Sequence, residues 1–255
     1  MRRGISNVRL LTPIAILTIV LAAPSVVCGQ SSTAAPAPRA ADGKPDLSGI
    51  WELRKDRPCP KDGCPDMQLS EQFFDIGYRL KGGLPYQPWA AALVKQRQAQ
   101  FGKEDPTSRC LPGGVVRWFT WPYYNKIIQT PREIVVLGER EQGYREIFTD
   151  GRPLPTDPIP SWKGYSRGTW DGDALVVRTN GLRDGLWLDR NGSPLTDEAV
   201  VTERFRRPDD GHLEIEITVD DRKAYTAPWT ITVTQLLVPD TDLAEFVCLE
   251  NERPR

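Results

Sequence analysis

Apolar and polar residues alternate along most of the chain after about residue 117, which is the pattern of half-buried β-strands. In the segment HLEIEITV, Leu213, Ile215, Ile217 and Val219 share one face and the polar side chains share the other. The same alternation predicts strands over residues 124–130, 132–139, 144–150, 164–170, 173–179, 200–207, 212–219, 229–238 and 244–250, after a short first strand over 46–54.

Short turns link several of these segments, at Gln142-Gly143, Asp171-Gly172 and Asp210-Gly211. Glycine at such positions allows the positive φ of tight hairpin turns, so we expect the neighbouring strands to be antiparallel. A sheet of about nine or ten strands must protect its two edges, and closure into a barrel removes them. The sequence therefore predicts an all-β antiparallel meander closed as a barrel, with a two-sheet β-sandwich as the alternative.

Two segments after the first strand carry apolar residues at the three- and four-residue spacing of helices. They are PDMQLSEQFFDIGYR, residues 66–80, and QPWAAALVKQRQAQF, residues 87–101, where Pro88 suits a first helical turn. We therefore expect a helical insertion over residues 66–101.

The start of the chain has the layout of a secretory signal peptide, because Arg2, Arg3 and Arg9 precede an apolar run that ends in small residues. We expect cleavage near Gln30 after Sec-type export, and a periplasmic or secreted location. Val27 stands where a lipoprotein signal needs a small residue, so we do not expect a lipid anchor at Cys28.

The remaining chain divides by composition. After the signal peptide, residues 1–29, residues 30–45 are rich in Ala, Pro and Ser and predict a flexible leader, and residues 46–255 suit a single domain. No apolar run beyond the signal is long enough to span a membrane. The 33 basic and 34 acidic residues nearly balance, so we expect no nucleic-acid partner.

Four cysteines remain after export, and an even number in an oxidising compartment predicts disulfides. The bend in CPKDGC favours a Cys59–Cys64 bond, which leaves Cys110 to pair with Cys248. A four-cysteine zinc site is the alternative, and the isolated positions of Cys110 and Cys248 argue against it.

The alternation places one carboxylate inside the barrel. Glu203 lies between Val201 and Phe205 on the apolar face of its strand, and Gln235 is a polar residue on the apolar face of another. A buried carboxylate must be paired, hydrated or protonated. Glu203 is therefore the candidate anchor of a ligand and the candidate catalytic acid or base.

The hairpin around Asp171-Gly172 adds a possible pocket wall. Pairing Trp170 with Asp173 places Ser166, Gly168, Trp170, Asp173, Leu175 and Val177 inward and leaves Arg167, Val176 and Arg178 on the outer, solvated face. Glycine in a strand marks a bend or the close approach of another group. Trp170, Ser166, Gly168 and Gln235 are thus predicted ligand-binding residues, unless Trp170 simply fills the core.

The proline-rich loop TDGRPLPTDPIPSWKGY is the second candidate ligand-binding region, with Arg152, Asp157 and Trp162 as its predicted ligand-binding residues. It is too long for a hairpin turn and carries Asp150, Arg152, Asp157 and Trp162, which suits a rim or lid over a barrel mouth. In the alternative interpretation the loop is a structural cap in which Arg152 pairs with Asp150 or Asp157.

The segment SGIW, with Gly49 and Trp51, resembles the G-x-W signature of lipocalins, whose tryptophan plugs one end of an eight-stranded barrel. The helical insertion departs from that family. Segments along nearly the whole exported chain are similar to an uncharacterised family of exported bacterial proteins: PDLSGIW, LPYQPWA, CLPGG, IIQTPREIVVL, DGRPLP, GYSRGTWDGDALVV and YTAPW. This resemblance implies the compartment and the fold, and no particular activity.

The sequence lacks a nucleophile elbow, a phosphate loop and the H-E-x-x-H metal motif, and its one histidine, His212, lies in a turn. We therefore expect no cofactor or metal. Three functions stay open: binding of a small hydrophobic or aromatic molecule in a barrel cavity, cofactor-independent lyase, isomerase or hydrolase chemistry through Glu203 on a small molecule or sugar, and an envelope interaction protein without a cavity.

Overall fold

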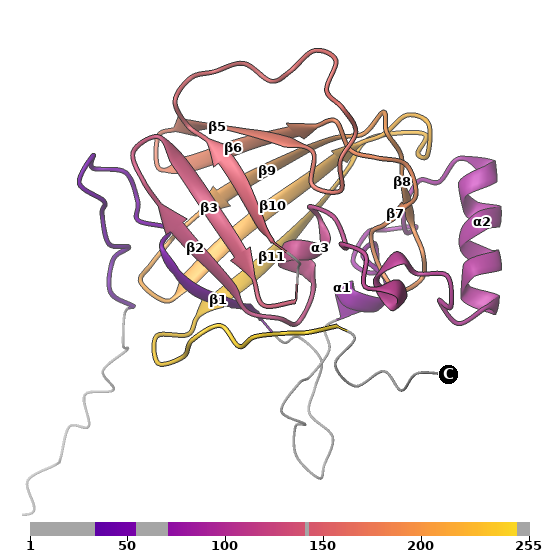
Figure 1. Cartoon of the computed structure of the whole chain (residues 1–255), viewed down its shortest axis with the longest axis horizontal. Helices are drawn as coiled ribbons and strands as arrows, with labels where there is room; N and C mark the ends of the chain where they lie inside the picture. Colours follow the sequence, from indigo (N-terminus) through magenta and orange to yellow (C-terminus); the bar gives the residue numbers. More distant parts are fainter. Residues whose placement is uncertain (1–33, 55–70, 141–142, 249–255) are drawn as a thin grey trace, which may run out of the picture. The chain divides into compact units, whose positions relative to one another are not determined.

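A closed barrel of nine strands is the centre of the structure, a computed structural model that describes residues 34–54, 71–140 and 143–248 (Figure 1). The strands follow one another around the barrel in the order β1-β11-β10-β9-β6-β5-β4-β3-β2. The predicted barrel is confirmed, and the sandwich is excluded. The strands are β1 (Gly49–Leu53), β2 (Asn125–Gln129), β3 (Glu133–Gly138), β4 (Tyr144–Phe148), β5 (Tyr165–Asp171), β6 (Ala174–Asn180), β9 (Val200–Arg206), β10 (His212–Asp220) and β11 (Trp229–Leu237).

One pair of neighbours departs from the predicted antiparallel meander. Strands β4 and β5 run parallel, with Ile147 opposite Ser166, whereas the other barrel pairs are antiparallel. Parallel neighbours need a crossover connection, because the chain must return to the starting end before the second strand begins. The proline-rich residues 149–164 make that connection, which explains why this loop is too long for a hairpin.

The barrel interior is filled by the apolar face that the alternation predicts. Leu213, Ile215, Ile217 and Val219 of β10 are fully buried. A short helix that the sequence pattern did not predict, α3 (Arg117–Thr120), also contributes to this core. Its Phe119 ring packs edge to face against Phe205, with ring centres 5.4 Å apart.

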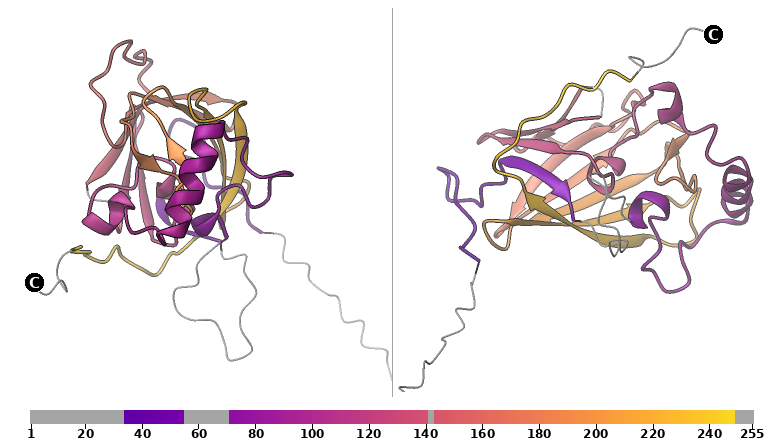
Figure 2. Two further views of the ribbon diagram at one scale, coloured as in Figure 1. Left: turned by 90° about the vertical axis from the view of Figure 1, so that its right-hand side faces the viewer. Right: turned by 90° about the horizontal axis from the view of Figure 1, so that it is seen from below.

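The helical insertion lies where it was predicted but is less helical than expected. Its described part contains α1 (Glu71–Phe74) and α2 (Pro88–Ala99), and the 3-10 turn η1 (Pro106–Arg109) follows the predicted range. Figures 1 and 2 show α2 beyond one end of the barrel, near the small sheet of β7 (Leu186–Trp187) and β8 (Pro194–Leu195). Arg97 fastens α2 there by donating to the carbonyl oxygen of Gly192 at 2.7 Å.

The segments before the first barrel strand and after the last one both contact the barrel. Residues 30–45 were expected to be a flexible leader, but in its described part Pro36 bridges to Asp209, and both terminal nitrogens of Arg39 donate to Asp173 at 2.6 Å. The strand predicted over residues 244–250 is wrong, because described residues 238–248 have no regular structure. This segment follows the barrel wall and ends in the predicted Cys110–Cys248 disulfide (Figure 1).

The predicted Cys59–Cys64 bond, the signal peptide and Cys28 lie outside the described residues. Within the described residues, no helix is long and apolar enough to cross a bilayer.

Candidate functional site

Glu203 faces the barrel interior, as predicted, and its carboxylate pairs with the guanidinium of Arg145. Arg145 Nη1 donates to Glu203 Oε1 at 3.0 Å, and Arg145 Nη2 donates to Glu203 Oε2. Both side chains are at most 1% exposed. Of the ways to keep a carboxylate inside a barrel, this protein uses pairing.

Hydroxyl groups complete the contacts of this ion pair. Ser166 Oγ accepts from Arg145 Nε and Nη2 at 3.2 Å each, and Thr179 Oγ1 accepts from Nη2 at 3.1 Å. The space beside Gly168 is also filled, because a Cβ there would lie 3.0 Å from Leu175 Cδ1. The structure thus brings Glu203 and Ser166 together with an arginine that the sequence analysis missed.

The position of Arg145 could have been found from the alternation. It stands two residues before Ile147 on β4, and Ile147 is an apolar residue of the inward face. Residues two apart on a strand share a face. The ion pair gives Glu203 a structural explanation, and its catalytic role stays a prediction.

The hairpin register differs from the predicted one. Trp170 pairs with Leu175 and Asp171 with Ala174, so Gly172 and Asp173 form the turn. Moving the turn by one residue shifts the cross-strand partners by two, which preserves the inward and outward faces. Asp173 is the exception, because a turn residue belongs to neither face, and its side chain is 63% exposed and paired with Arg39.

The other predicted interior residues lie in different surroundings. Trp170 is half-buried against the core, with Lys44 Nζ 5.9 Å from its ring centre. Gln235 is fully buried, and its Nε2 donates to the carbonyl oxygen of Phe119 at 2.8 Å. Gln235 therefore anchors α3 to β11.

The residues of the proline-rich loop do not converge on one point. Arg152 Nε donates to both carboxylate oxygens of Asp150, at 2.9 and 2.8 Å, as in the structural interpretation. The hydrogen bond from Arg152 lowers the pKa of Asp150 to about 2. Asp157 is exposed, and Trp162 packs partly against the core with the guanidinium of Arg183 4.2 Å from its ring centre.

A hollow of about 470 Å³ lies between this loop and the outer face of β5 and β6. Leu154 of the loop and Val176 of β6 supply its apolar lining. The polar lining consists of Arg167, Thr169, Asp171 and Arg178. The sequence analysis placed Arg167, Val176 and Arg178 on the outer face correctly but did not predict a site there.

Two arginines stand directly opposite each other in this hollow. Arg167 on β5 is the cross-strand partner of Arg178 on β6. Like charges in this position destabilise a sheet. In the described part of the chain neither guanidinium has a carboxylate partner, whereas Asp171 is paired with Arg204 at 2.8 Å. The hollow therefore carries two uncompensated positive charges.

Arg167 is held in place before any ligand arrives. Its Nε donates to the carbonyl oxygen of Pro153 at 3.1 Å, and its Nη1 donates to that of Ser166 at 2.8 Å. Its guanidinium also lies 4.9 Å from the ring centre of Phe148, whose ring contacts Arg152 as well. Burial, and then the charge of Arg152, lower the pKa of Arg167, and the charge of Asp150 only partly opposes them. A bound anion would relieve this accumulation of positive charge.

A second hollow, of about 450 Å³, lies where β1 ends against β11 and has a mainly polar lining that includes Arg54, Thr232 and Thr234. Arg54 directly precedes residues 55–70, which the structure does not describe, so we assign this hollow no role. Among the described residues, no group of His, Cys, Asp and Glu side chains could hold a metal ion.

Comparison with known proteins found no matching family model, no matching curated protein and no matching solved structure. The functional argument therefore rests on the geometry of the chain itself.

Proposed function

We propose that this is an exported binding protein for a small molecule that combines an acidic group with an apolar or aromatic body. The hollow between the proline-rich loop and strands β5 and β6 is the proposed site. One observation carries the proposal: two arginines that have no carboxylate partner among the described residues lie side by side on neighbouring strands, in a hollow that Leu154 and Val176 also line.

The chemistry of the lining defines the ligand class. A guanidinium presents N–H groups in a planar fork that matches a carboxylate, and charge-assisted hydrogen bonds of this kind are stronger than neutral ones. Arg167 is already oriented by two carbonyl groups, so its binding to an anion costs little further side-chain entropy. Leu154 and Val176 would cover the apolar body of the same ligand.

This proposal keeps the small hydrophobic or aromatic ligand predicted from the sequence and moves it from the interior to the outer wall. The interior around Glu203 is occupied by Arg145 and its hydroxyl partners. The disulfide between Cys110 and Cys248 is compatible with an oxidising compartment and supports the exported location.

Calorimetric titration with 1-naphthoate and its neutral analogue 1-naphthamide tests the proposal. We expect naphthoate to bind and naphthamide to bind at least about tenfold more weakly, because only the carboxylate forms charge-assisted bonds with the arginines. Arg178→Gln should abolish most of this preference. Arg206→Gln is the matched control, since Arg206 also lies on the outer face but is paired with Glu214.

Equal binding of the acid and the amide, or unchanged binding of the acid to Arg178→Gln, would contradict the proposal. Absence of binding by both probes would contradict it as well.

A further inference from the structure

A cavity of about 10 Å³ lies beside α3, where the chain turns into β2. Its lining includes Arg117 and Trp118 of α3, Trp121 just after it, and Arg140 beyond the end of β3. The centre of a water-sized particle can occupy this volume, so the cavity has room for a single small particle such as a water molecule or a monatomic ion.

Three of these lining residues carry a buried side-chain N–H group that has no acceptor among the described residues. Arg117 Nε, Trp118 Nε1 and Trp121 Nε1 are all buried and have no hydrogen-bond partner among the described residues. The exposed fractions of the three residues are 1%, 1% and 3%. Buried donors are almost always satisfied, and these groups can only donate. Their missing partner must therefore be an acceptor.

The neighbouring polar groups are already engaged. Asn125 Nδ2 donates to the carbonyl oxygens of Trp118 and Tyr123, at 2.8 and 3.2 Å. The hydroxyl group of Tyr123 accepts from Arg140 Nη1 at 3.0 Å. The three N–H groups are therefore the buried side-chain polar groups of these lining residues that still lack a partner among the described residues.

The charge around the cavity is positive. Arg117 is neutralised by Asp105, whose carboxylate accepts from Arg117 Nη1 and Nη2 at 2.8 and 3.0 Å. Burial alone would raise the pKa of Asp105, but the hydrogen bonds and charge of Arg117 outweigh burial and keep the pKa below its usual value. Arg140 has no carboxylate partner in the part of the chain that the structure describes. Among the described residues, one positive charge at the cavity is therefore not paired with a carboxylate.

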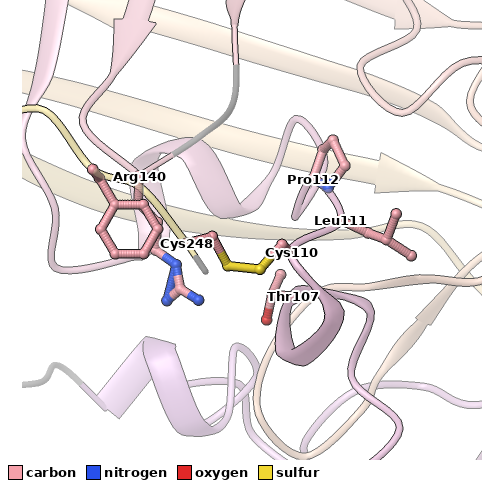
Figure 3. A pocket seen from close by; sticks show the side chains of 7 residues that line it. Thr107, Cys110, Leu111, Pro112, Arg140 and Cys248 are labelled. Atoms are coloured by element: carbon pink, nitrogen blue, oxygen red, sulfur yellow. A yellow bond between two sulfur atoms is a disulfide. The ribbon is translucent and has the colours of Figure 1, made fainter. Parts of the chain in front are cut away.

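Arg140 is held at this place from the other side. It also lines a small pocket with Cys110, Cys248 and Phe246 (Figure 3), and its guanidinium lies 5.3 Å from the ring centre of Phe246. On the cavity side it lies 5.0 Å from the ring centre of Trp121. The guanidinium of Arg140 therefore lies between the rings of Phe246 and Trp121, and it lines both the pocket at the disulfide and the cavity.

We propose that the cavity is a binding site for a small monovalent anion of halide size, which accepts hydrogen bonds from Trp118, Trp121 and Arg117 and balances the charge of Arg140. A water molecule accepts only two hydrogen bonds and must place two hydrogens of its own, whereas a halide accepts from all three donors. This site is separate from the outer hollow and does not depend on the function proposed for it.

Bromide soaking of crystals of the wild-type protein tests the proposal directly. We expect an anomalous-scattering peak in the cavity, within hydrogen-bonding distance of the three nitrogen atoms. Density without anomalous signal, which would identify a water molecule, would overturn the proposal.

Thermal unfolding gives a second measurement, in sodium chloride and in sodium gluconate at equal ionic strength. Chloride should raise Tm, because a ligand that binds only the folded state stabilises it. Trp121→Phe keeps an aromatic ring but removes one N–H group, so it should weaken the apparent chloride affinity about tenfold. Trp89→Phe is the control, since Trp89 Nε1 donates to the carbonyl oxygen of Lys223 on the surface.

If Trp121→Phe does not fold, Arg140→Gln replaces it with the same expectation. The same Tm in chloride and gluconate for the wild-type protein, or a chloride effect that neither variant reduces, would contradict the proposal.

Discussion

At the scale of single residues, the ion pair between Arg145 and Glu203 is a fully buried polar feature, as is the pair between Arg117 and Asp105. Three hydrogen bonds from Arg145 to the hydroxyl groups of Ser166 and Thr179, together with the bonds between Arg145 and Glu203, leave both charged side chains hydrogen-bonded although they are buried. Removing one member of such a pair leaves an uncompensated buried charge, which costs more than the pair contributes when intact.

Glu203→Gln should therefore lower the free energy of unfolding by about 3 kcal/mol, because the guanidinium of Arg145 would stay buried without a counter-charge. Urea unfolding measures the change. Glu216→Gln on the exposed face of β10 is the control and should change stability by less than about 0.5 kcal/mol.

The same variant tests the catalytic role predicted for Glu203. A purely structural role predicts lower stability with unchanged binding of naphthoate in the outer hollow. A variant of unchanged stability that loses binding or turnover would instead support a direct role in function.

For the two opposed arginines, Arg167 and Arg178, we expect a substitution to stabilise the protein, in contrast to Glu203→Gln. Arg178→Gln should raise the free energy of unfolding of the ligand-free protein by about 0.2–1 kcal/mol, because it removes a like-charge cross-strand pair. The gain should shrink at high salt, where exposed charges are screened. Thermal unfolding at low and high ionic strength checks this, and a loss of stability in both would show that Arg178 has a favourable partner.

At the scale of elements, the irregular segment 238–248 is held by a covalent bond instead of by strand pairing. The disulfide links Cys110 and Cys248, which are 138 residues apart. Phe246 in this segment contacts Arg140, and Arg140 lines the cavity beside α3. The disulfide therefore also supports the wall of the proposed anion site.

The double substitution Cys110→Ser with Cys248→Ser should lower the free energy of unfolding by about 2–5 kcal/mol, because the unfolded chain gains the freedom of a long open loop. Urea unfolding of the oxidised wild-type protein and the variant measures the difference. Reductant should destabilise the wild-type protein by more than it destabilises the variant. An equal response of the two proteins would show that another cysteine pair carries the stabilisation.

The hairpin of β5 and β6 shows that a local sequence pattern can predict a turn without giving its exact register. The Asp-Gly pair predicted a tight turn, and Gly172 does adopt positive φ there, at 59°. The turn nevertheless consists of Gly172 and Asp173, so the cross-strand partners differ from the predicted ones. Once the turn is placed at Gly172 and Asp173, counting residues along the two strands pairs Arg167 with Arg178.

At the scale of the whole molecule, closure of the barrel brings together residues from distant parts of the chain. Strand β1 pairs with both β11 and β2, so the first strand joins the two ends of the sheet. The antiparallel order of the barrel strands is broken only between β4 and β5, which run parallel. The crossover loop required there forms one side of the outer hollow. The proposed site is thus a consequence of the topology.

The sequence by itself determined what depends on neighbouring residues. Alternation identified the barrel strands and placed Glu203 and Gln235 inward, because residues two apart on a strand share a face. The cysteine spacing and count also indicated the Cys110–Cys248 bond.

Only the tertiary structure decided which side chains meet. Arg145 and Glu203 are 58 residues apart, and Arg117 and Asp105 pair through a helix too short to show a helical period. The parallel pairing of β4 with β5 likewise depends on how the strands are arranged around the barrel. The composition of either strand does not determine it. Ion pairing, edge pairing and the filling of cavities depend on positions in space, and a local sequence pattern carries no information about distant partners.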